Sequence, residues 1–180
     1  MEEYVTVAGI GHRDIGDHDK CYRATCSLLL ELKRRYTDKA LRIVSPLAEG
    51  ADILIVKAGV SLGLSYSVLL PMPVRLYEAD FTDAASLAEF HHLLAGAKEV
   101  RTVDYYAHNT LELVSRPGIH RDYQYRACGY KLARDCEQMI ALFDGDSSTI
   151  KLGGTADVIA YRQALHRPLK MLQCERMTLK

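Results

Sequence analysis

A pair of glycines that leads into a predicted helix is the clearest candidate ligand site in this sequence. Gly153 and Gly154 are followed by Thr155 and a run with helical periodicity. Adjacent glycines let the backbone approach a ligand without clashes from Cβ atoms, and the first N–H groups of a helix are unpaired and lie at its positive dipole end. Thr155 can cap the helix and also offers a hydroxyl group. The pattern predicts a phosphate-binding turn, although an ordinary strand-to-helix turn can have the same residues.

A second possible anion site follows the first predicted strand, at Gly11, His12 and Arg13. The small Gly11 admits a ligand close to the backbone, and the planar guanidinium group of Arg13 suits a phosphate or a carboxylate. A solvated surface arginine is the alternative. His12 is suited either to hydrogen-bond a ribose or to cap the next helix.

The loop after the second predicted strand contributes Ser45, Glu49 and Gly50. The Glu49 carboxylate can accept hydrogen bonds from ribose hydroxyl groups, and the N–H of Gly50 can face a phosphate. A favourable interaction with a helix dipole explains Glu49 almost as well.

Two more strand ends complete the set of candidate binding residues. Pro71 ends the third predicted strand, and Tyr77 and Asp80 follow it. The Tyr77 ring is suited to stack on a base or to cover the core, and Asp80 to bind a sugar hydroxyl or a base amine. Asp144 and Gly145 end the fifth predicted strand and directly precede the glycine-pair loop.

Composition favours a small ligand over a polymer. Lys plus Arg and Asp plus Glu both number 23, so the formal net charge is zero and no global basic field exists to hold a nucleic-acid backbone. Nucleic acid is therefore expected to be an unlikely partner. The 5 cysteines are an odd number without metal-ligand spacing, which predicts reduced, mostly buried thiols and no metal site. The adjacent His91 and His92 point in different directions on a helix and do not form a metal pair.

Cellular location is predicted from what the sequence lacks. The acidic N-terminus leads directly into a strand-like run without the features of a signal peptide. No apolar run approaches the length of about 18 residues that a membrane span needs. The sequence predicts a cytoplasmic protein without a membrane partner, and its 180 residues suffice for one domain, 1–180.

The candidate residues must be positioned by the elements around them, and these alternate regularly. Short apolar or β-branched runs alternate with segments of helical periodicity, as in a parallel sheet covered by helices on both faces. We therefore predict a Rossmann-like α/β/α sandwich of about six strands. The predicted strands are 5–10, 41–46, 66–70, 100–104, 139–143 and 169–172, and the predicted helices are 18–36, a helix after Asp52 ending at Gly63, 82–98 with Thr82 as N-cap, 121–138 and 155–166.

In a sheet of this kind, ligands bind outside the carboxyl ends of the strands, near the point where the strand order reverses. The loops with the candidate residues all follow strand ends, so they are expected to meet at one edge of the sheet. The segment 105–120 is a long polar connection to which we assign no structure and which suits a flap or an interface.

Seven sequence blocks, in this order, resemble the SLOG superfamily of Rossmann-like nucleotide-binding proteins, which includes the LOG phosphoribohydrolases and DNA-processing proteins. The blocks are GHR (11–13), SPLAEGAD (45–52), LPMP (70–73), YEADF (77–81), QYR (124–126), IALFDG (140–145) and GGTAD (153–157). The resemblance covers nearly the whole chain. It implies a pocket for a mononucleotide or an ADP-ribose-like molecule and, from many relatives, a sensor role in bacterial defence or signalling. Such a ligand is expected without any required cofactor.

An N-glycoside hydrolase or transferase of the LOG phosphoribohydrolase type, acting on a nucleoside monophosphate, is the alternative function. In those enzymes a glutamate in the helix after the glycine loop assists cleavage, whereas this chain has Asp157 and no glutamate there. Asp157, Glu49 and Asp80 are the candidate catalytic residues, but acid/base groups must lie within hydrogen-bonding reach of the substrate. The absence of this glutamate favours binding or sensing of the nucleotide over its turnover. From its relatives, the protein is expected to form a dimer or a larger homo-oligomer and to act with a separate effector protein.

Overall fold

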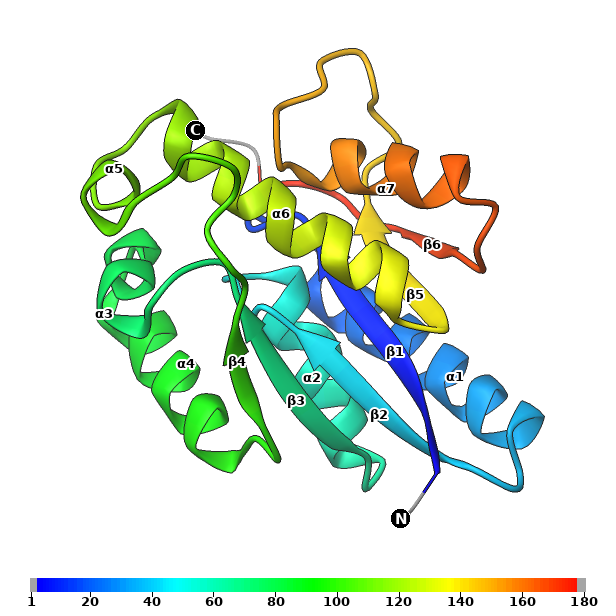
Figure 1. Cartoon of the computed structure of the whole chain (residues 1–180). Helices are drawn as coiled ribbons and strands as arrows, with labels where there is room; N and C mark the ends of the chain where they lie inside the picture. The colour runs from blue at the N-terminus through cyan, green and yellow to red at the C-terminus, as the bar shows by residue number, and fades with distance from the viewer. Residues whose placement is uncertain (1–2, 178–180) are drawn as a thin grey trace.

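Six parallel strands form one sheet with helices on both faces in the computed structural model, which describes residues 3–177 (Figure 1). The strand order is β4-β3-β2-β1-β5-β6, so the order reverses between β1 and β5. The strands are β1 Tyr4–Gly11, β2 Ala40–Ser45, β3 Ser65–Leu70, β4 Val100–Thr102, β5 Gln138–Phe143 and β6 Lys170–Gln173. The predicted Rossmann-like α/β/α sandwich is confirmed.

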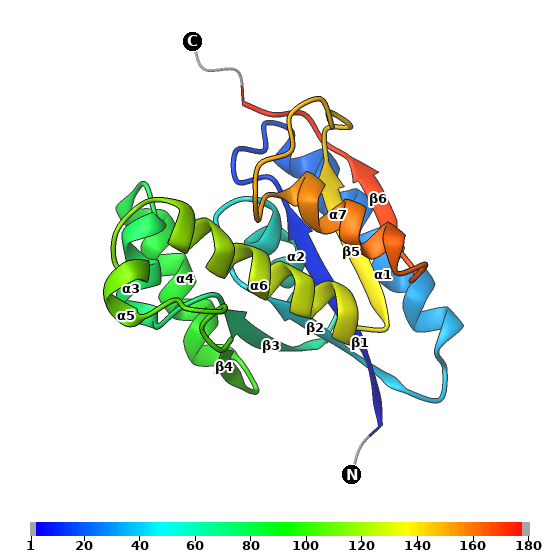
Figure 2. The same cartoon turned by 45° about the horizontal axis from the view of Figure 1, so that its top comes forward.

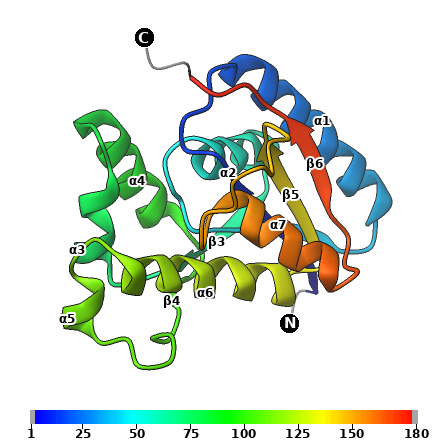
Figure 3. The same ribbon diagram turned by 90° about the horizontal axis from the view of Figure 1, so that it is seen from above.

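The helices form the outer layers of the sandwich. Helices α1 and α2 pack together on one face of the sheet and α6 and α7 on the other (Figure 2), as the view from above in Figure 3 shows most clearly. The helices are α1 His18–Arg35, α2 Ala51–Ser61, α3 Val74–Tyr77, α4 Ala84–Gly96, α5 Leu111–Val114, α6 Ile119–Asp135 and α7 Thr155–Ala164, with a 3-10 turn η1 at Glu78–Asp80.

The alternation of side chains along the central strands produces a core on each face. In β1, Val5 and Val7 belong to the apolar cluster under α1 and α2, whereas Ala8 and Ile10 belong to the cluster under α6 and α7. All of β5 is buried, because it lies between two neighbouring strands and between two helical layers. This double burial explains why the central strands read as apolar runs in the sequence.

Three sequence predictions need correction around the long connections. The helix predicted from 82 begins at Ala84, and Asp83 rather than Thr82 is its N-cap, because the Asp83 carboxylate accepts from Ala85 and Ser86. The segment 77–81, which the sequence indicates as a loop after the third strand, contains the end of α3 and η1. The unassigned segment 105–120 contains α5 and the first residues of α6, which starts earlier than predicted.

The predicted state of the cysteines agrees with the structure. All 5 are free thiols, and Cys26 alone among them is partly exposed rather than buried. Between residues 3 and 177 no helix is long and apolar enough to cross a membrane.

Candidate functional site

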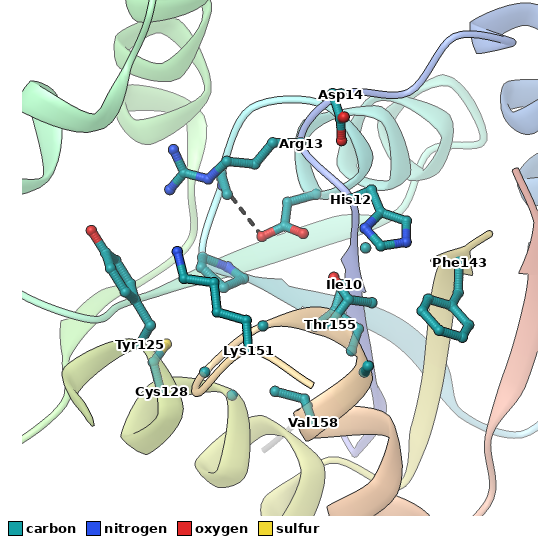
Figure 4. A pocket seen from close by; sticks show the side chains of 18 of the residues that line it. Ile10, His12, Arg13, Asp14, Tyr125, Cys128, Phe143, Lys151, Thr155 and Val158 are labelled. Carbon is teal, nitrogen blue, oxygen red and sulfur yellow. Dashed lines mark hydrogen bonds between the residues drawn. The ribbon is translucent and has the colours of Figure 1, made fainter. Parts of the chain in front are cut away.

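A cavity lies above the carboxyl ends of β1 and β5, where the strand order reverses. Its volume is about 660 Å³. Loops after β1, β2, β3 and β5 reach it, together with α6 and the start of α7 (Figure 4). This is the position at which doubly wound sheets bind their ligands.

The floor of the cavity depends on a close approach of three backbone segments at Gly11. A Cβ atom on this residue would lie 2.4 Å from the Cβ of Ala51 and 2.5 Å from the carbonyl oxygen of Leu142. No side chain fits there, so the glycine brings the ends of β1 and β5 and the start of α2 together. The N–H of Ala51 in turn donates to the carbonyl of His12 at 3.0 Å.

The glycine-pair loop packs on α6 and presents the N-terminus of α7 to the cavity. Gly153 has a φ of +71°, and a Cβ atom on it would lie 2.7 Å from the backbone nitrogen of Arg126. Gly154 is the N-cap of α7, and no side chain among residues 3–177 caps this helix end. The first N–H groups of α7 are therefore left for a ligand at the positive end of the helix dipole.

Asp157 shapes this loop from behind and does not line the cavity. Its Oδ2 accepts from the N–H of Gly153 at 2.9 Å and lies 3.2 Å from Nε of Arg126. Its Oδ1 accepts from the hydroxyl of Tyr130 at 3.0 Å, and the residue is buried. The structure therefore gives this catalytic candidate a structural position, in which all its partners are groups of the protein.

A cluster around Asp80 forms the wall beside η1. Arg121 donates from Nη2 to Asp80 Oδ1 at 2.7 Å and from Nε to the hydroxyl of Tyr125 at 2.8 Å. The Tyr125 hydroxyl donates to the other carboxylate oxygen of Asp80. Burial and the neighbouring carboxylate raise the pKa of Tyr125 well above its ordinary value. Arg13 completes the cluster by donating to the carbonyl of Asp80 at 3.0 Å.

His12 and Asp144 pair across the β1–β5 crevice, with 3.0 Å between Nε2 and Oδ1. Burial alone would raise the pKa of Asp144, but the N–H of Asp146 and the His12 ring outweigh it and hold the pKa below its usual value. Arg176, after β6, lies 3.9 Å from Asp144 and donates to both carboxylate oxygens of Asp14 at 3.0 Å. This side of the cavity is therefore a network of compensated charges.

Lys151 differs from the other cations of the cavity. Its side chain reaches into the space that Arg13 and Tyr125 also face (Figure 4). Within the described residues, Lys151 forms no ion pair, whereas Arg13 and Arg176 both do. A cation without a protein partner beside an uncapped helix end is suited to an anionic ligand.

Most of the predicted binding residues meet in this cavity. It is lined by Gly11, His12, Arg13, Pro71, Tyr77, Asp80, Asp144, Gly153, Gly154 and Thr155. Tyr77 is only 1% exposed and packs edge-on against Phe81 and Phe90, so its role as core cover is the one that the structure supports.

Four predicted binding residues do not line the cavity. The hydroxyl of Ser45 is buried and accepts from the N–H of Leu47, and Gly145 lies beside Gln173. Glu49 accepts from the N–H and hydroxyl of Thr82 at 2.8 and 3.1 Å, which fixes the segment before α4. Together with Gly50, it faces a separate groove between α1, α2 and α4. Glu49 is therefore not placed to act on a ligand in the cavity, as binder or as catalyst.

Sequence reasoning missed three residues that matter here. The position of Tyr125 within its helix has the spacing of a core residue, yet its hydroxyl faces the cavity. The arginine four residues before it is the signal that indicates a polar partner. Lys151 precedes Gly153 by two residues and matches none of the patterns that identify a binding residue. Arg176 lies after the last strand, where no pattern marks it. The described residues contain no group of three or more His, Cys, Asp or Glu side chains placed to hold a metal ion.

By its fold, the chain is a Rossmann-like α/β protein. No family model and no curated protein sequence matches it. Two solved structures share its fold. DNA processing protein A from Streptococcus pneumoniae superposes with a TM-score of 0.56 at 15% identity, over 94% of this chain and 50% of that one. DNA processing protein A from Helicobacter pylori, described for its single-stranded DNA binding mode, superposes with a TM-score of 0.57 at 19% identity, over 97% of this chain and 67% of that one.

The present chain thus spans half the length of the first protein and about two thirds of the second. These similarities correct two expectations. Nucleic acid was expected to be an unlikely partner, and a small nucleotide-derived molecule, bound or hydrolysed, was expected in its place. Both expectations are wrong, because the Helicobacter pylori protein that shares this fold is described as binding single-stranded DNA. The error has a physical cause: a net charge of zero averages over the whole surface and does not exclude a local cationic site.

Proposed function

We propose that this protein binds single-stranded DNA at the cavity above β1 and β5, with a backbone phosphate at the N-terminus of α7. The observation that carries the proposal is the uncapped start of α7, which opens on the glycine pair into the cavity beside Lys151. Backbone N–H groups at a helix N-terminus are established partners for nucleic-acid phosphates. We further propose that the chain belongs to the SLOG superfamily and that 1–180 acts as one unit.

The charges of the cavity suit a single phosphate better than a long run of them. Three of its five aspartates pair with basic side chains: Asp80 with Arg121, Asp144 with His12 and Asp14 with Arg176. The other two, Asp52 and Asp146, accept from the backbone N–H groups of Ala48 and Ser148. Lys151 remains for the ligand. The half-buried Tyr125 ring adds an aromatic wall, and stacking on aromatic rings is a sequence-tolerant way to hold single-stranded bases. A duplex, whose bases are already stacked, cannot use that wall.

Fluorescence anisotropy with a labelled thymidine oligonucleotide tests the proposal. We expect saturable binding, weaker binding of a hairpin duplex and poor competition by thymidine monophosphate. Lys151→Gln is expected to weaken binding several-fold at low salt and to lower the slope of log K against log salt by about 1, since one phosphate contact is lost.

Lys20→Gln is the matched control, because it removes the same charge from an exposed position on α1 outside the cavity. It is expected to leave binding unchanged. Equal binding of duplex and single strand, equal effects of the two substitutions, or no binding at all would overturn the proposal.

A further inference from the structure

We propose that single-stranded DNA continues from the cavity across the outer side of α6 and α7, where aromatic side chains form a base-stacking surface. This inference rests on the proposed function and extends its binding site. We call the surface the tyrosine surface; its members are Tyr106, Tyr123, Arg126, Tyr130 and Tyr161.

The tyrosine surface consists of two flat pairs of rings on either side of an arginine. The rings of Tyr130 and Tyr161 are 3.7 Å apart and nearly parallel, with an angle of 3°. Those of Tyr106 and Tyr123 are 5.0 Å apart at 5°. The guanidinium carbon of Arg126 lies 4.7 Å from the centre of the Tyr130 ring. Because the rings of each pair cover one another's inner faces, only the outer faces remain as planar π surfaces of the kind that nucleic-acid bases stack on.

Helix periodicity places three members side by side on α6. Tyr123, Arg126 and Tyr130 are separated by three and four residues, which is the spacing of neighbours on one side of a helix. Tyr161 joins them from α7. The two helices approach closely because Gly129 lies against Val158; a Cβ atom on Gly129 would lie 2.4 Å from a methyl carbon of Val158.

Tyr106 is held in its place by a buried amide. Gln124 is fully buried, and its oxygen accepts from the N–H of Tyr106 at 3.0 Å, while its nitrogen donates to the carbonyl of Asp104 at 2.9 Å. Asn109 also donates to the Gln124 oxygen, at 3.2 Å. The loop after β4 is therefore fixed against α6, and Tyr106 is still 44% exposed. An exposed ring on a fixed backbone loses little freedom when a base stacks on it.

The glycine loop makes the tyrosine surface continuous with the cavity. Gly153 packs directly on the backbone of Arg126 and beside the Cβ of Tyr125. Tyr125 faces the cavity, whereas the next residue, Arg126, turns outward to Asp157 and Tyr130. A DNA strand that places one phosphate at the start of α7 therefore reaches the tyrosine surface by crossing the glycine loop. This continuity favours DNA over a protein partner as the occupant.

Charge on the tyrosine surface is close to balanced, which indicates stacking as its main contribution. Arg126 pairs with Asp157, and Lys131 and Arg134 pair with Asp135. A longer strand is therefore expected to gain affinity on reaching the rings with little added salt dependence, because few counterions are released by compensated cations.

The test uses thymidine oligonucleotides of increasing length, from a dinucleotide upwards, on the full chain. Tyr106→Leu/Tyr161→Leu keeps apolar bulk without a π face, and Tyr106→Phe/Tyr161→Phe keeps the ring; neither side-chain hydroxyl has a hydrogen-bond partner in the described structure. We expect the Tyr106→Leu/Tyr161→Leu double variant (the Leu pair) to bind the longer strands about tenfold more weakly than the wild type. Its affinity for the dinucleotide is expected to be unchanged. The Phe pair is expected to behave as the wild type, and melting curves check that each variant folds.

Photocrosslinking with iododeoxyuridine gives a direct readout, and the expected adducts are on Tyr106 or Tyr161. If the Leu pair binds long strands like the wild type while Lys151→Gln weakens them, the cavity proposal stands and the tyrosine surface is refuted. If no strand of any length binds, both proposals fall. A change of oligomeric state with unchanged DNA affinity would show that the tyrosine surface holds a second protein chain instead.

Discussion

Helix α4 begins behind Asp83, whose carboxylate accepts hydrogen bonds from the N–H groups of Ala85 and Ser86 at 2.9 Å each. Helix α7 begins behind Gly154, which has no side chain to do the same. The start of α4 is closed by its own sequence, and the start of α7 opens into the cavity. The contrast shows how one kind of helix end serves stability and another is left for a ligand.

Both helix ends have an aspartate, so the difference lies in where the carboxylate points. Asp83 points forward, into the first turn of α4. Asp157 points back, to the N–H of Gly153 four residues earlier. Asp52 in α2 does likewise, since it accepts from the N–H of Ala48, also four residues earlier. The two helices that start at the cavity thus use an aspartate to shape the incoming loop.

The largest expected effect concerns Asp52, which lacks the arginine partner that Asp157 has at 3.2 Å. Burial, only partly offset by the N–H of Ala48 and by Arg13, raises the pKa of Asp52 from 3.8 to about 7. The folded protein then holds a proton that the unfolded chain releases near pH 4. The free energy of unfolding should therefore fall as the pH rises from about 4 to about 7, by roughly 4 kcal/mol at most, and level off above.

Denaturant titrations across this pH range measure that decline. Asp52→Asn keeps an oxygen acceptor for Ala48 and removes the titration, so its stability is expected to vary much less between pH 4 and 7. An equally steep decline in the variant would assign the pH dependence to other groups.

A smaller effect on stability is expected from substituting Asp157. This loss of stability distinguishes a structural role of Asp157 from a catalytic one. Asp157→Ala leaves the N–H of Gly153 without its acceptor and the Arg126 guanidinium without its ion-pair partner, and it should cost about 2 to 3 kcal/mol of stability. It should also weaken DNA binding, because the loop that presents α7 loses its brace. Asp157→Asn keeps one acceptor oxygen, so its stability and its DNA affinity should lie between those of the wild type and those of Asp157→Ala.

Asp83→Ala is the comparison variant, since it removes the cap of α4. It is expected to cost about 1 kcal/mol in urea titrations without changing DNA affinity. Loss of DNA affinity in Asp83→Ala, or unaffected affinity in Asp157→Ala, would break the distinction between the two helix ends.

The sequence was sufficient to predict the fold because the information is local and repeated. The central strands β1, β2, β3 and β5 are mostly apolar runs bounded by turn residues, and the carboxyl-end rule then brought Gly11, Arg13 and Gly153 to one cavity. The first residue of a helix was harder to predict where two possible N-cap residues are neighbours in the sequence. Thr82 and Asp83 both suit an N-cap, and the choice depends on Glu49, which binds Thr82 from a distant loop.

The direction of side chains and the chemistry of the site were beyond the sequence. Glu49 follows a strand end like the true lining residues, but the turn after β2 directs it into another groove. Tyr125 has core spacing and yet faces the cavity, because the Asp80 and Arg121 that bind its hydroxyl come together only in the fold. The partner prediction failed for a related reason: formal charge does not reveal which cations are paired.

The most direct test of the account adds a carboxylate at the start of each helix. Thr155→Glu and Ala84→Glu each place a negative charge at the first residue of a helix, α7 and α4 respectively, where the dipole tolerates or favours it. Single-stranded DNA affinity, measured by anisotropy at matched salt, is expected to fall at least tenfold, or about 1.4 kcal/mol, in Thr155→Glu and to stay unchanged in Ala84→Glu. Equal affinities in the two variants would contradict a phosphate site at α7.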